Sequence, residues 1–443
     1  MTSKNLRNLF LFAVTLLMVC QLGWAQSAAI PPDKTLGAKA VAAVQATGQA
    51  VPVVPASAIA AAPRAAARPL VWLGPSLGAN PTVQAGEPSI CERVNGSWYT
   101  FCPAGLQTAY GVKQIVGPNG GAGMTIAIVD AYAYSLAEAN FAKFNSDMGL
   151  PACTTGNGCF TSVNLSPYDG TGSGWDLESM LDLEYAHAMA PNAKIVYVQA
   201  FDNSYDGLCA AVGIAAGMAD VVSNSWSGGE NTAYDFYWNL AKPLLFASGD
   251  VGNWPSQGFV GYPCSSPLVT CVGGTSLYVN ATTHLRSSEV AWAGSGGGCS
   301  TAEPIPSWQM NLTLGSAVCA PYRASPDIAA IANPYTGVAV YILNSHFTGG
   351  YYQVGGTSLA TPVMAGIFAD IDTARVSFGK SKLATATLNP SLYNAAASNY
   401  NYFFYDVLAG SNGYLAGPKF DLATGLGVSA GPAMANWFFG LIP

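Results

Sequence analysis

Charged side chains are scarce in this sequence. Lysine, arginine, aspartate and glutamate make up 9% of its 443 residues, and 24 acidic against 17 basic residues give a formal net charge of −7. A partner that binds through phosphate groups needs a basic surface, so the composition excludes nucleic acid as a ligand. Because few ion pairs can form, little stability is lost when carboxylates take up protons, and the composition is compatible with acidic conditions.

Long apolar runs are missing beyond the N-terminus. Residues 1–25 combine Lys4 and Arg7 with an apolar run over 9–19 and with small residues, Gly23 and Ala25, at the cleavage positions. This pattern predicts a secretory signal peptide. No later segment approaches the roughly 18 uninterrupted apolar residues of a membrane anchor. We therefore expect a secreted or periplasmic protein, without stable membrane association, that is a monomer.

Cysteine is frequent enough for several disulfides in the exported chain. Removal of the signal peptide would take away Cys20 and leave nine of the ten cysteines. Eight of these lie in close pairs, which in an exported protein predicts disulfides within local loops. The pairs are Cys91 with Cys102, Cys153 with Cys159, Cys264 with Cys271, and Cys299 with Cys319. We expect Cys209, in an apolar helical stretch, to be a buried free thiol. A papain-like nucleophile is the alternative, but no histidine pattern accompanies it.

The order of patterns along the chain predicts a leader followed by one α/β domain. Residues 26–80 are assigned to a low-complexity leader rich in alanine and proline, and residues 81–443 to the domain. Strand patterns at 124–132, 193–200 and 221–227 alternate with helical patterns at 136–148, 177–190 and 207–219. Such alternation implies a doubly wound, mainly parallel sheet with helices on both faces. The stretch 255–352, rich in glycine, serine, proline and aromatic residues, indicates loops and hairpins.

The strongest motif is the octapeptide GGTSLATP at residues 355–362, followed by an apolar helical run. Its two glycines let the backbone approach a substrate, and Ser358 would lie at the positive end of a helix dipole. Negative charge that develops beside Ser358 would be stabilised there. A helix cap would explain a bare Gly-Thr-Ser, whereas the complete motif favours a nucleophile.

Histidine, the usual base for a serine nucleophile, occurs only three times. The octapeptide resembles the nucleophile motif of subtilisins, yet none of His187, His284 and His346 lies in the His-Gly-Thr-His setting of that clan. His187 is in a helical stretch of apolar and small residues and is interpreted as a packing residue. A neutral peptidase that uses His187 remains the alternative.

Carboxyl groups are the remaining candidates for proton transfer. Glu178 and Asp182 are four residues apart in a helical pattern, so they share a face, and their repulsion keeps a proton on one of them. A solvated acidic face is the alternative reading of this spacing. Asp250 follows the apolar run 244–247. A protonated aspartate there could donate to an oxyanion, which indicates acidic pH, although a turn aspartate is the alternative.

Several short motifs together resemble the sedolisins, the serine-carboxyl peptidases, over roughly residues 97–430. They are WYTFCPAGLQTAYGV at 98–112, the Glu-x-x-x-Asp helix, SNSWS at 223–227, ASGD at 247–250, SGGGCS at 295–300, PSWQ at 306–309, ASPDIAAIANPYTGV at 324–338 and GTSLATP at 356–362. Each motif is weak alone, and their combination is specific. The resemblance implies a subtilisin-like α/β fold.

The resemblance also implies a role for each candidate residue. Glu178 would be the general base for Ser358, and Asp182 would orient Glu178. Asp250 would complete the oxyanion hole together with the backbone N–H of the nucleophile.

For the substrate, the resemblance implies an extended peptide that lies as an added strand beside Ser225, Trp226 and Ser227.

One calcium site is implied near the C-terminus. Its ligands would be the carboxylates of Asp406 and Asp421 with the carbonyls of Val407, Gly417 and Lys419. Oxygen ligands on turns suit calcium. Lys419 stands where the family usually has glycine, which leaves a backbone carbonyl but adds a positive side chain. Two turn aspartates are the alternative.

The sequence therefore predicts a secreted, acid-active serine-type endopeptidase that acts on proteins or peptides through an acyl-enzyme on Ser358. Two alternatives stay open: a neutral peptidase of the Ser-His-Asp type, and a catalytically silent exported binding protein on the same scaffold.

Overall fold

The computed structural model describes residues 67–69, 72–78, 83–84, 87–88, 91, 94–95, 98–280, 282–343 and 349–439. The predicted signal peptide at 1–25, with Cys20, and most of the predicted leader lie outside these residues, as does His346. Inside the range 26–80, the described residues form the strands β1 (Arg68–Pro69) and β2 (Trp72–Gly78). The predicted domain boundary at residue 81 stays a prediction.

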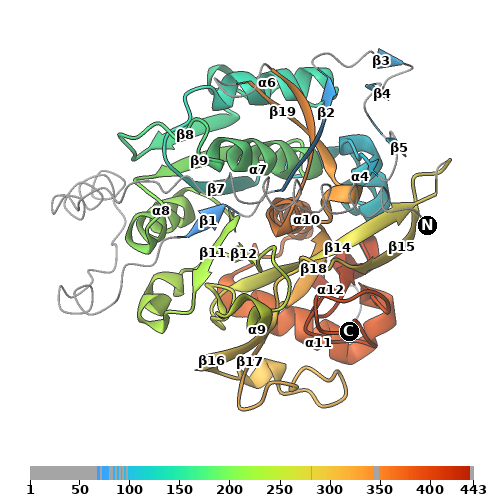
Figure 1. The fold of residues 1–443 in the computed structure, drawn as a ribbon. Coiled ribbons are helices and arrows are strands. Elements are labelled where there is room, and N and C mark those ends of the chain that lie inside the picture. The colour runs from blue at the N-terminus through green and yellow to red at the C-terminus, as the bar shows by residue number, and fades with distance from the viewer. Residues whose placement is uncertain are drawn as a thin grey trace, which may run out of the picture. The chain divides into compact units, whose positions relative to one another are not determined.

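A ten-stranded sheet runs through the described chain, in the order β21-β22-β18-β14-β12-β10-β7-β9-β8, with β15 paired to β14 (Figure 1). Its strands are β7 (Thr125–Ala131), β8 (Phe160–Asn164), β9 (Lys194–Ala200), β10 (Val221–Asn224), β12 (Leu244–Ala247), β14 (Thr270–Val279), β15 (Arg286–Ala291), β18 (Ile328–Ile331), β21 (Phe404–Tyr405) and β22 (Val428–Ser429). Pairing is parallel from β8 to β22, and only β15 and β21 join antiparallel.

Smaller sheets flank this one. β11 (Trp226–Gly229) lies between β1 and β13 (Gly261–Tyr262), and β20 (Gly350–Gly355) lies between β19 (Val338–Ile342) and β2. The remaining pairs are β16 (Gly298–Pro304) with β17 (Tyr322–Ser325), β3 (Val83–Gln84) with β4 (Glu87–Pro88), and β5 (Val94–Asn95) with β6 (Trp98–Tyr99).

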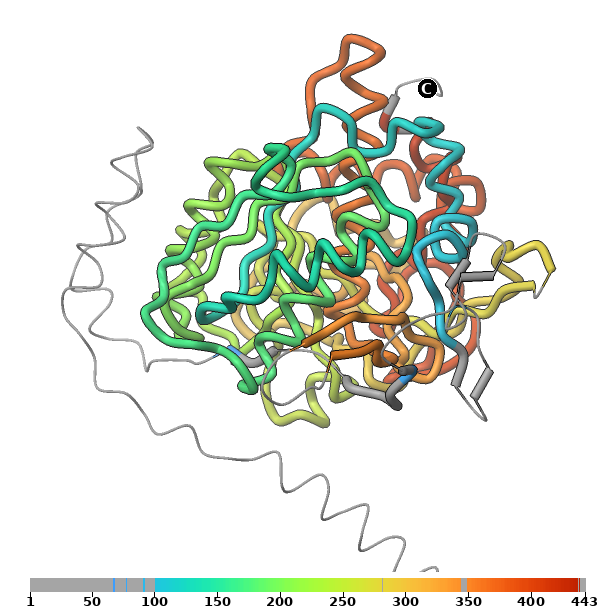
Figure 2. Tube along the Cα trace, turned by 90° about the horizontal axis from the view of Figure 1, so that it is seen from above, coloured from blue at the N-terminus to red at the C-terminus, as the bar shows by residue number. Residues whose placement is uncertain are grey.

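Helices cover both faces of the sheet, which confirms the predicted α/β class. The α-helices are α4 (Pro103–Tyr110), α5 (Lys113–Val116), α6 (Ala137–Asp147), α7 (Trp175–Met189), α8 (Tyr205–Met218), α9 (Trp254–Gln257), α10 (Thr357–Ser377), α11 (Thr385–Phe403) and α12 (Pro432–Phe439). The 3-10 helices are η1 (Gly117–Asn119), η2 (Thr155–Asn157), η3 (Thr232–Trp238), η4 (Ser307–Gln309) and η5 (Pro334–Thr336). The helices α7 and α10 pack against each other, and α5 lies beside α10 and α12 (Figure 2).

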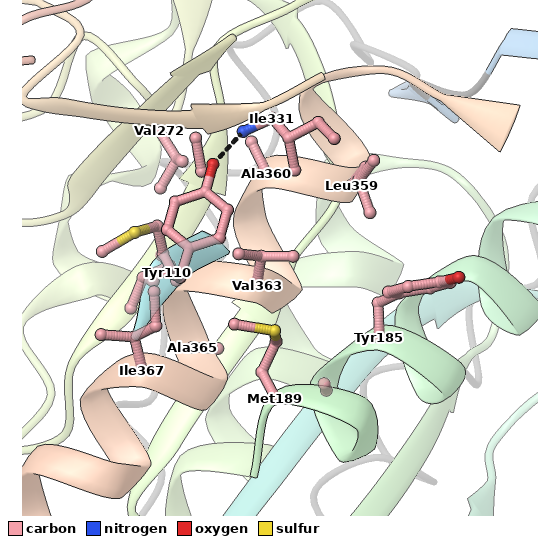
Figure 3. Close-up of a cluster of buried hydrophobic side chains, with 14 of the residues drawn as sticks. Tyr110, Tyr185, Met189, Val272, Ile331, Leu359, Ala360, Val363, Ala365 and Ile367 are labelled. Atoms are coloured by element: carbon pink, nitrogen blue, oxygen red, sulfur yellow. Dashed lines mark hydrogen bonds between the residues drawn. The ribbon is translucent and has the colours of Figure 1, made fainter. Parts of the chain in front are cut away.

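The apolar run after Ser358 anchors the nucleophile in the core. Leu359, Val363 and Ile367 recur every four residues on α10, and all three are fully buried. Figure 3 shows them among side chains from α7, β14 and β18. Each such side chain contributes about 1.5–3 kcal/mol through burial. The N-terminus of α10 is thereby held in one position.

One expectation about the fold was wrong. Residues 255–352 contain more than loops and hairpins, because β14 and β18 both join the central parallel sheet. Two glycines, Gly273 and Gly274, weaken the strand signal of β14. A Cβ at Gly273 would lie 2.7 Å from Pro326 Cγ, and one at Gly274 would lie 2.6 Å from Ala332 Cβ, so both positions require glycine for close packing.

The disulfide prediction is confirmed. The structure contains Cys91–Cys102, Cys153–Cys159, Cys264–Cys271 and Cys299–Cys319. Cys209 is a free and fully buried thiol, as expected. Among the helices that the structure describes, none combines the length and hydropathy needed to span a bilayer.

Candidate active site

Ser358 lies at the start of α10, directly after β20. The turn between them depends on Gly356, whose φ of +129° is disfavoured for a residue with a Cβ. Gly356 is also the N-cap of α10, and no side chain caps the helix. The helix-cap reading of this motif is therefore excluded. Ser358 itself is fully buried.

Pro362 explains part of the motif. A proline at this position has no N–H to donate to the carbonyl of Ser358, four residues earlier. The hydroxyl of Ser225 donates to that carbonyl instead, at 3.2 Å, and also lies 2.9 Å from Oδ1 of Asp182. Ser225 thus connects the first turn of α10 with a carboxyl group on α7.

The helix α7 is buried on every side, so its acidic residues do not form a solvated face. Glu178 and Asp182 are both 0% exposed. Burial raises the pKa of Glu178 well above its usual range, and the charges of Asp182 and Asp130 raise it further. Burial, followed by the charge of Asp130, likewise raises the pKa of Asp182. These carboxyls hold protons at a pH where exposed ones are ionised.

Glu178 faces the nucleophile without a hydrogen bond to it. The nearby Ser358 hydroxyl lowers the Glu178 pKa, yet neither carboxylate oxygen has a hydrogen-bond partner among the described residues. The Ser358 hydroxyl instead makes a long contact of 3.4 Å with the carbonyl of Ser225. Catalytic hydrogen bonds are often long before substrate binds, so this geometry is compatible with a base at Glu178.

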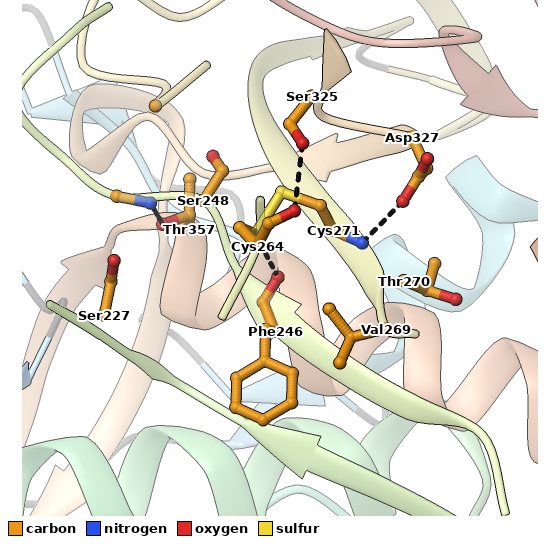
Figure 4. The surroundings of a disulfide bond; sticks show 12 residues. Ser227, Phe246, Ser248, Cys264, Val269, Thr270, Cys271, Ser325, Asp327 and Thr357 are labelled. Atoms are coloured by element: carbon orange, nitrogen blue, oxygen red, sulfur yellow. Dashed lines mark hydrogen bonds between the residues drawn. A yellow bond between two sulfur atoms is a disulfide. The ribbon is translucent and has the colours of Figure 1, made fainter. Parts of the chain in front are cut away.

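Asp250 follows β12 and contacts the residue beside the nucleophile. Its Oδ1 accepts hydrogen bonds from the N–H and the hydroxyl of Thr357, both at 2.7 Å. The N–H of Gly249 donates to the same hydroxyl at 3.1 Å (Figure 4). Oδ2 of Asp250 is buried and has no partner in the described chain. Burial raises the pKa of Asp250 to about 7, so below that pH Oδ2 can carry a proton.

The SGGGCS motif holds the Asp250 loop in place. The N–H of Gly296 donates to the carbonyl of Gly249 at 2.7 Å. A Cβ at Gly296 would lie only 1.9 Å from the carbonyl oxygen of Ser248, so this approach requires glycine. The Cys264–Cys271 disulfide lies close to the same region (Figure 4).

Asp130 is a further acid at the candidate site, and none of the sequence motifs indicates it. It lies near the end of β7, is fully buried, and neither of its oxygens has a hydrogen-bond partner in the described chain. Burial raises its pKa to about 7. Its charge raises the pKa values of Glu178 and Asp182, which places it in the same cluster. The sequence feature that could have indicated it is a single acid near the carboxyl end of the apolar run MTIAIVDAY, where parallel strands carry functional residues.

His187 has a structural role elsewhere on α7. Its ring nitrogen Nε2 lies 3.0 Å from the carbonyl of Pro151, and the ring packs edge-on against Phe141. Burial lowers the His187 pKa to about 4. It is nine residues from Glu178, about 13 Å along the helix. The packing interpretation fits these contacts.

The predicted substrate-binding residues lie at the end of β10 and the start of β11. Ser225 and Trp226 are fully buried and Ser227 nearly so, so their backbone is what a peptide would meet. The strand β1 pairs antiparallel with this backbone, Arg68 opposite Ser227 and Pro69 opposite Trp226.

The candidate calcium ligands lie around Tyr400. Its hydroxyl is 3.0 Å from Oδ1 of Asp406 and 3.0 Å from the carbonyl of Lys419, which has a φ of +66°. The ammonium of Lys419 points away to the carbonyl of Thr313, at 2.8 Å. Burial raises the pKa of Asp421 to about 6.

The donor chemistry at this position suits a hard cation. In the described chain, the carbonyls of Val407 and Gly417 accept no hydrogen bond. Two carboxylates and free carbonyls are ligands that calcium prefers. The residues present therefore fit such an ion.

Comparison with known proteins gives consistent results. Residues 166–425 match the subtilase family (Peptidase S8). Kumamolisin from Bacillus sp. (strain MN-32) is 30% identical over 379 residues, which cover 76% of this chain and 65% of kumamolisin. Sedolisin from Pseudomonas sp. (strain 101) is 27% identical over 394 residues, which cover 79% of this chain and 63% of sedolisin. The alignments thus span less than two thirds of either relative.

Among solved structures, Pseudomonas sedolisin, a serine-carboxyl proteinase in complex with two molecules of pseudo-iodotyrostatin, matches with a TM-score of 0.65 and 24% identity. The match covers 78% of this chain and 99% of that one, and it confirms the subtilisin-like fold. These relatives confirm the predicted resemblance to the sedolisins. Because the family match covers more than half of the 443 residues, the chain belongs to the subtilase family.

Proposed function

We propose that this protein is a serine-type endopeptidase that hydrolyses proteins or peptides at acidic pH outside the cytoplasm. One observation carries the proposal. Ser358 lies at a helix N-terminus beside a cluster of buried carboxyl groups, Asp130, Glu178, Asp182 and Asp250, and within the described chain no oxygen of these four has an ion-pair partner. Such a cluster can exchange protons with a serine where a histidine is missing.

The proposed reaction begins when ionised Glu178 accepts the hydroxyl proton of Ser358. The serine oxygen then attacks the peptide carbonyl, and the resulting oxyanion accepts hydrogen bonds from the N–H of Ser358 and from protonated Oδ2 of Asp250. Glu178 passes its proton to the leaving amine, which leaves an acyl-enzyme. Water, deprotonated by Glu178, hydrolyses the ester and restores the serine. Asp182 keeps its proton and stabilises the ionised form of Glu178.

The test is cleavage of acid-denatured protein from pH 2 to 8 by wild type and Ser358→Ala. We expect the variant to lose about 10³-fold or more of the activity, because no other nucleophile is available. Ser377→Ala is a matched control on the same helix, since its hydroxyl bonds only the carbonyl of Ala374 among described residues. Activity that peaks above pH 7 and is lost in His187→Ala would overturn the carboxyl mechanism in favour of a Ser-His-Asp one.

A catalytically silent binding protein is distinguished by direct labelling. An acylating or aldehyde-type probe should modify Ser358 stoichiometrically in the enzyme at acidic pH. A chain that folds and binds peptide but leaves Ser358 unlabelled would support the binding-protein alternative.

We also propose that Asp406 and Asp421, with the carbonyls of Val407, Gly417 and Lys419, hold one structural calcium ion. When bound, the ion would neutralise the two partly buried carboxylates and link the turns that carry them. The Tm should rise with added calcium and fall in a chelator, and Asp421→Asn should remove this difference. An unchanged Tm in calcium and chelator would contradict the site.

A further inference from the structure

A cavity of about 250 Å³ lies beside the second half of α10, where this helix packs against α5 and α7. Its wall includes Asp370 of α10, which follows Ser358 by twelve residues, about 18 Å along the helix. The cavity is therefore separate from the candidate active site. An apolar cavity of about 150 Å³ already holds benzene, so this one has room for a ligand of the size of an amino acid.

Asp370 places an unpaired carboxyl group in the wall of this cavity. It is 1% exposed, and its Oδ1 has no hydrogen-bond partner among the described residues. Burial raises the pKa of Asp370 well above its usual range, and the N–H of Gly121 offsets only part of this effect. A buried polar atom costs free energy until water or a ligand supplies the missing partner. A cation is the partner that favours an ionised carboxyl.

A positive group lies at the opening of the same cavity. Lys113, at the start of α5, is exposed and lines the cavity, and its ammonium forms no ion pair with a described acidic residue. Asp370 and Lys113 are the charged residues of the lining, which also contains the apolar side chains of Val112, Leu150 and Met189. Because Asp370 is buried and Lys113 is exposed, the negative group lies inside and the positive group at the edge.

A metal ion fits this cavity poorly. Calcium takes six to eight oxygen ligands, whereas the lining offers one carboxylate. Two nearby carbonyls already accept hydrogen bonds from Asn192: the carbonyl of Gly120 from its N–H at 2.8 Å, and the carbonyl of Pro118 from its side-chain amide at 2.9 Å. Opposite charges with apolar side chains between them favour an organic ligand that carries both an ammonium and a carboxylate.

We propose that this cavity binds a free amino acid with an apolar side chain, with its ammonium against Asp370 and its carboxylate near Lys113. The ammonium supplies the charge-assisted hydrogen bond that the buried carboxyl lacks. The apolar side chain of the ligand contacts the wall. The inference does not depend on the proposed peptidase function.

Gly120 keeps space open beside the carboxyl group. A Cβ at this position would lie 2.9 Å from Oδ1 of Asp370 and 3.4 Å from Cδ of Pro191. The φ of Gly120 is −48°, which residues with a side chain adopt readily. Space rather than backbone conformation therefore requires glycine here, and a methyl group would crowd the place that we assign to the ammonium.

The experiment measures binding to the whole protein at pH 8, by calorimetry and by the shift of Tm. Its probes are leucine, 3-methylbutylamine, which lacks the carboxylate, and 4-methylpentanoate, which lacks the ammonium. Leucine should bind with a Kd about tenfold or more below that of either analogue, because each analogue loses one charged contact. At ten times its Kd, leucine should raise the Tm by about 2 °C.

Substitution of the carboxyl group tests the inner contact. Asp370→Asn keeps the shape of the side chain, and we expect the Kd values of leucine and of 3-methylbutylamine to rise about tenfold or more. Asp372→Asn is the matched control two residues later on α10, since Asp372 is also buried but does not line the cavity. Its Kd for leucine should equal that of wild type. Equal Kd values in the two variants would place any bound leucine elsewhere and overturn the inference.

Two further variants separate space from charge. Gly120→Ala keeps both charges but fills the space at Asp370, so leucine binding should weaken about tenfold or more. Lys113→Gln should leave the binding of 3-methylbutylamine unchanged and remove the advantage of leucine over it. If leucine at about 10 mM gives neither heat nor a shift of Tm in wild type, the cavity holds only water and the inference fails. An amine that binds as tightly as leucine would contradict the contact with Lys113.

Discussion

Buried acidic side chains in this molecule have contrasting surroundings: one is paired with an arginine, and others have no partner of opposite charge among the described residues. Asp327, before β18, is fully buried and receives both terminal nitrogens of Arg323, Nη1 to Oδ1 at 2.9 Å and Nη2 to Oδ2 at 2.7 Å. Oδ2 also accepts the N–H of Cys271 at 2.8 Å, and Oδ1 the hydroxyl of Tyr393 at 3.0 Å. At the candidate active site, Glu178 is equally buried and has no partner.

This difference in partners distinguishes an acid with a structural role from acids that can exchange protons in a reaction. A buried charge is tolerated when a partner and several hydrogen bonds offset its desolvation, as at Asp327. An unpaired buried carboxyl instead holds its proton, and its pKa rises. A group that takes up and releases protons within a working pH range is useful to a serine nucleophile, whereas a permanently paired one is not.

The largest expected effect is the loss of activity when Glu178 can no longer accept a proton. Glu178→Gln keeps the shape of the protonated side chain but cannot accept the serine proton, so we expect kcat/KM to fall by about 10³- to 10⁴-fold with an unchanged Tm. Glu184→Gln is the matched control on α7, because Glu184 is also fully buried but its Oε2 accepts the N–H of Tyr341 at 3.1 Å. Full activity in Glu178→Gln would remove the carboxyl base.

A change at the Arg323–Asp327 ion pair should lower stability and leave activity nearly unchanged. Arg323→Met leaves Asp327 buried without its cation, and we expect the free energy of unfolding in urea to fall by about 3–5 kcal/mol. Activity per folded molecule should stay close to wild type. The double variant Arg323→Met with Asp327→Leu should recover most of the loss, because no charge is then left unpaired. A stable single variant would show that the pair contributes little.

Two substitutions at Asp250 test whether this residue acts as a hydrogen-bond donor. Asp250→Ala removes the proposed oxyanion donor, and we expect kcat to fall by about 10²- to 10³-fold. Asp250→Asn should retain far more activity at acidic pH, because its amide can still accept from Thr357 and donates a hydrogen bond independently of pH. Equal losses in the two variants would mean that a hydrogen-bond donor at this position does not replace Asp250, which would contradict its role as an oxyanion donor.

Much of this site was predictable from sequence because its residues lie in local motifs. The turn at Gly356, the helix after Ser358 and the strand before Asp250 all follow from short-range pattern. The four-residue spacing of Glu178 and Asp182 correctly predicted one helix, but spacing alone could not show that α7 is buried on every side. Burial depends on α10 and on the sheet, which come from distant parts of the chain.

Other features depended on long-range pairing and were missed or misread. Asp130 joins the site because β7 lies inside the parallel sheet, between β10 and β9, which no local pattern around it reveals. β14 was concealed by Gly273 and Gly274, residues that weaken strand propensity but allow close packing. The pairing of β1 with β11 joins positions more than 150 residues apart, Arg68 with Ser227, and nothing in the alanine-rich leader signals it.

The smallest expected effect is the change that one buried carboxyl makes to the pH dependence of stability. Burial raises the pKa values of Asp130 and Asp250 from 3.8 to about 7, so between these values the folded chain holds protons that the unfolded chain has released. The free energy of unfolding should therefore be highest near pH 4 and fall as pH rises toward 7, by up to about 1.4 kcal/mol per pH unit for each retained proton. Asp250→Asn has no proton to lose at that position, so its slope in urea titrations at pH 5 and 6 should be shallower by up to that amount. Stability that rises through this window would mean that these carboxyls are ionised in the folded state, and they would then differ from Asp327 only in lacking an ion-pair partner among the described residues.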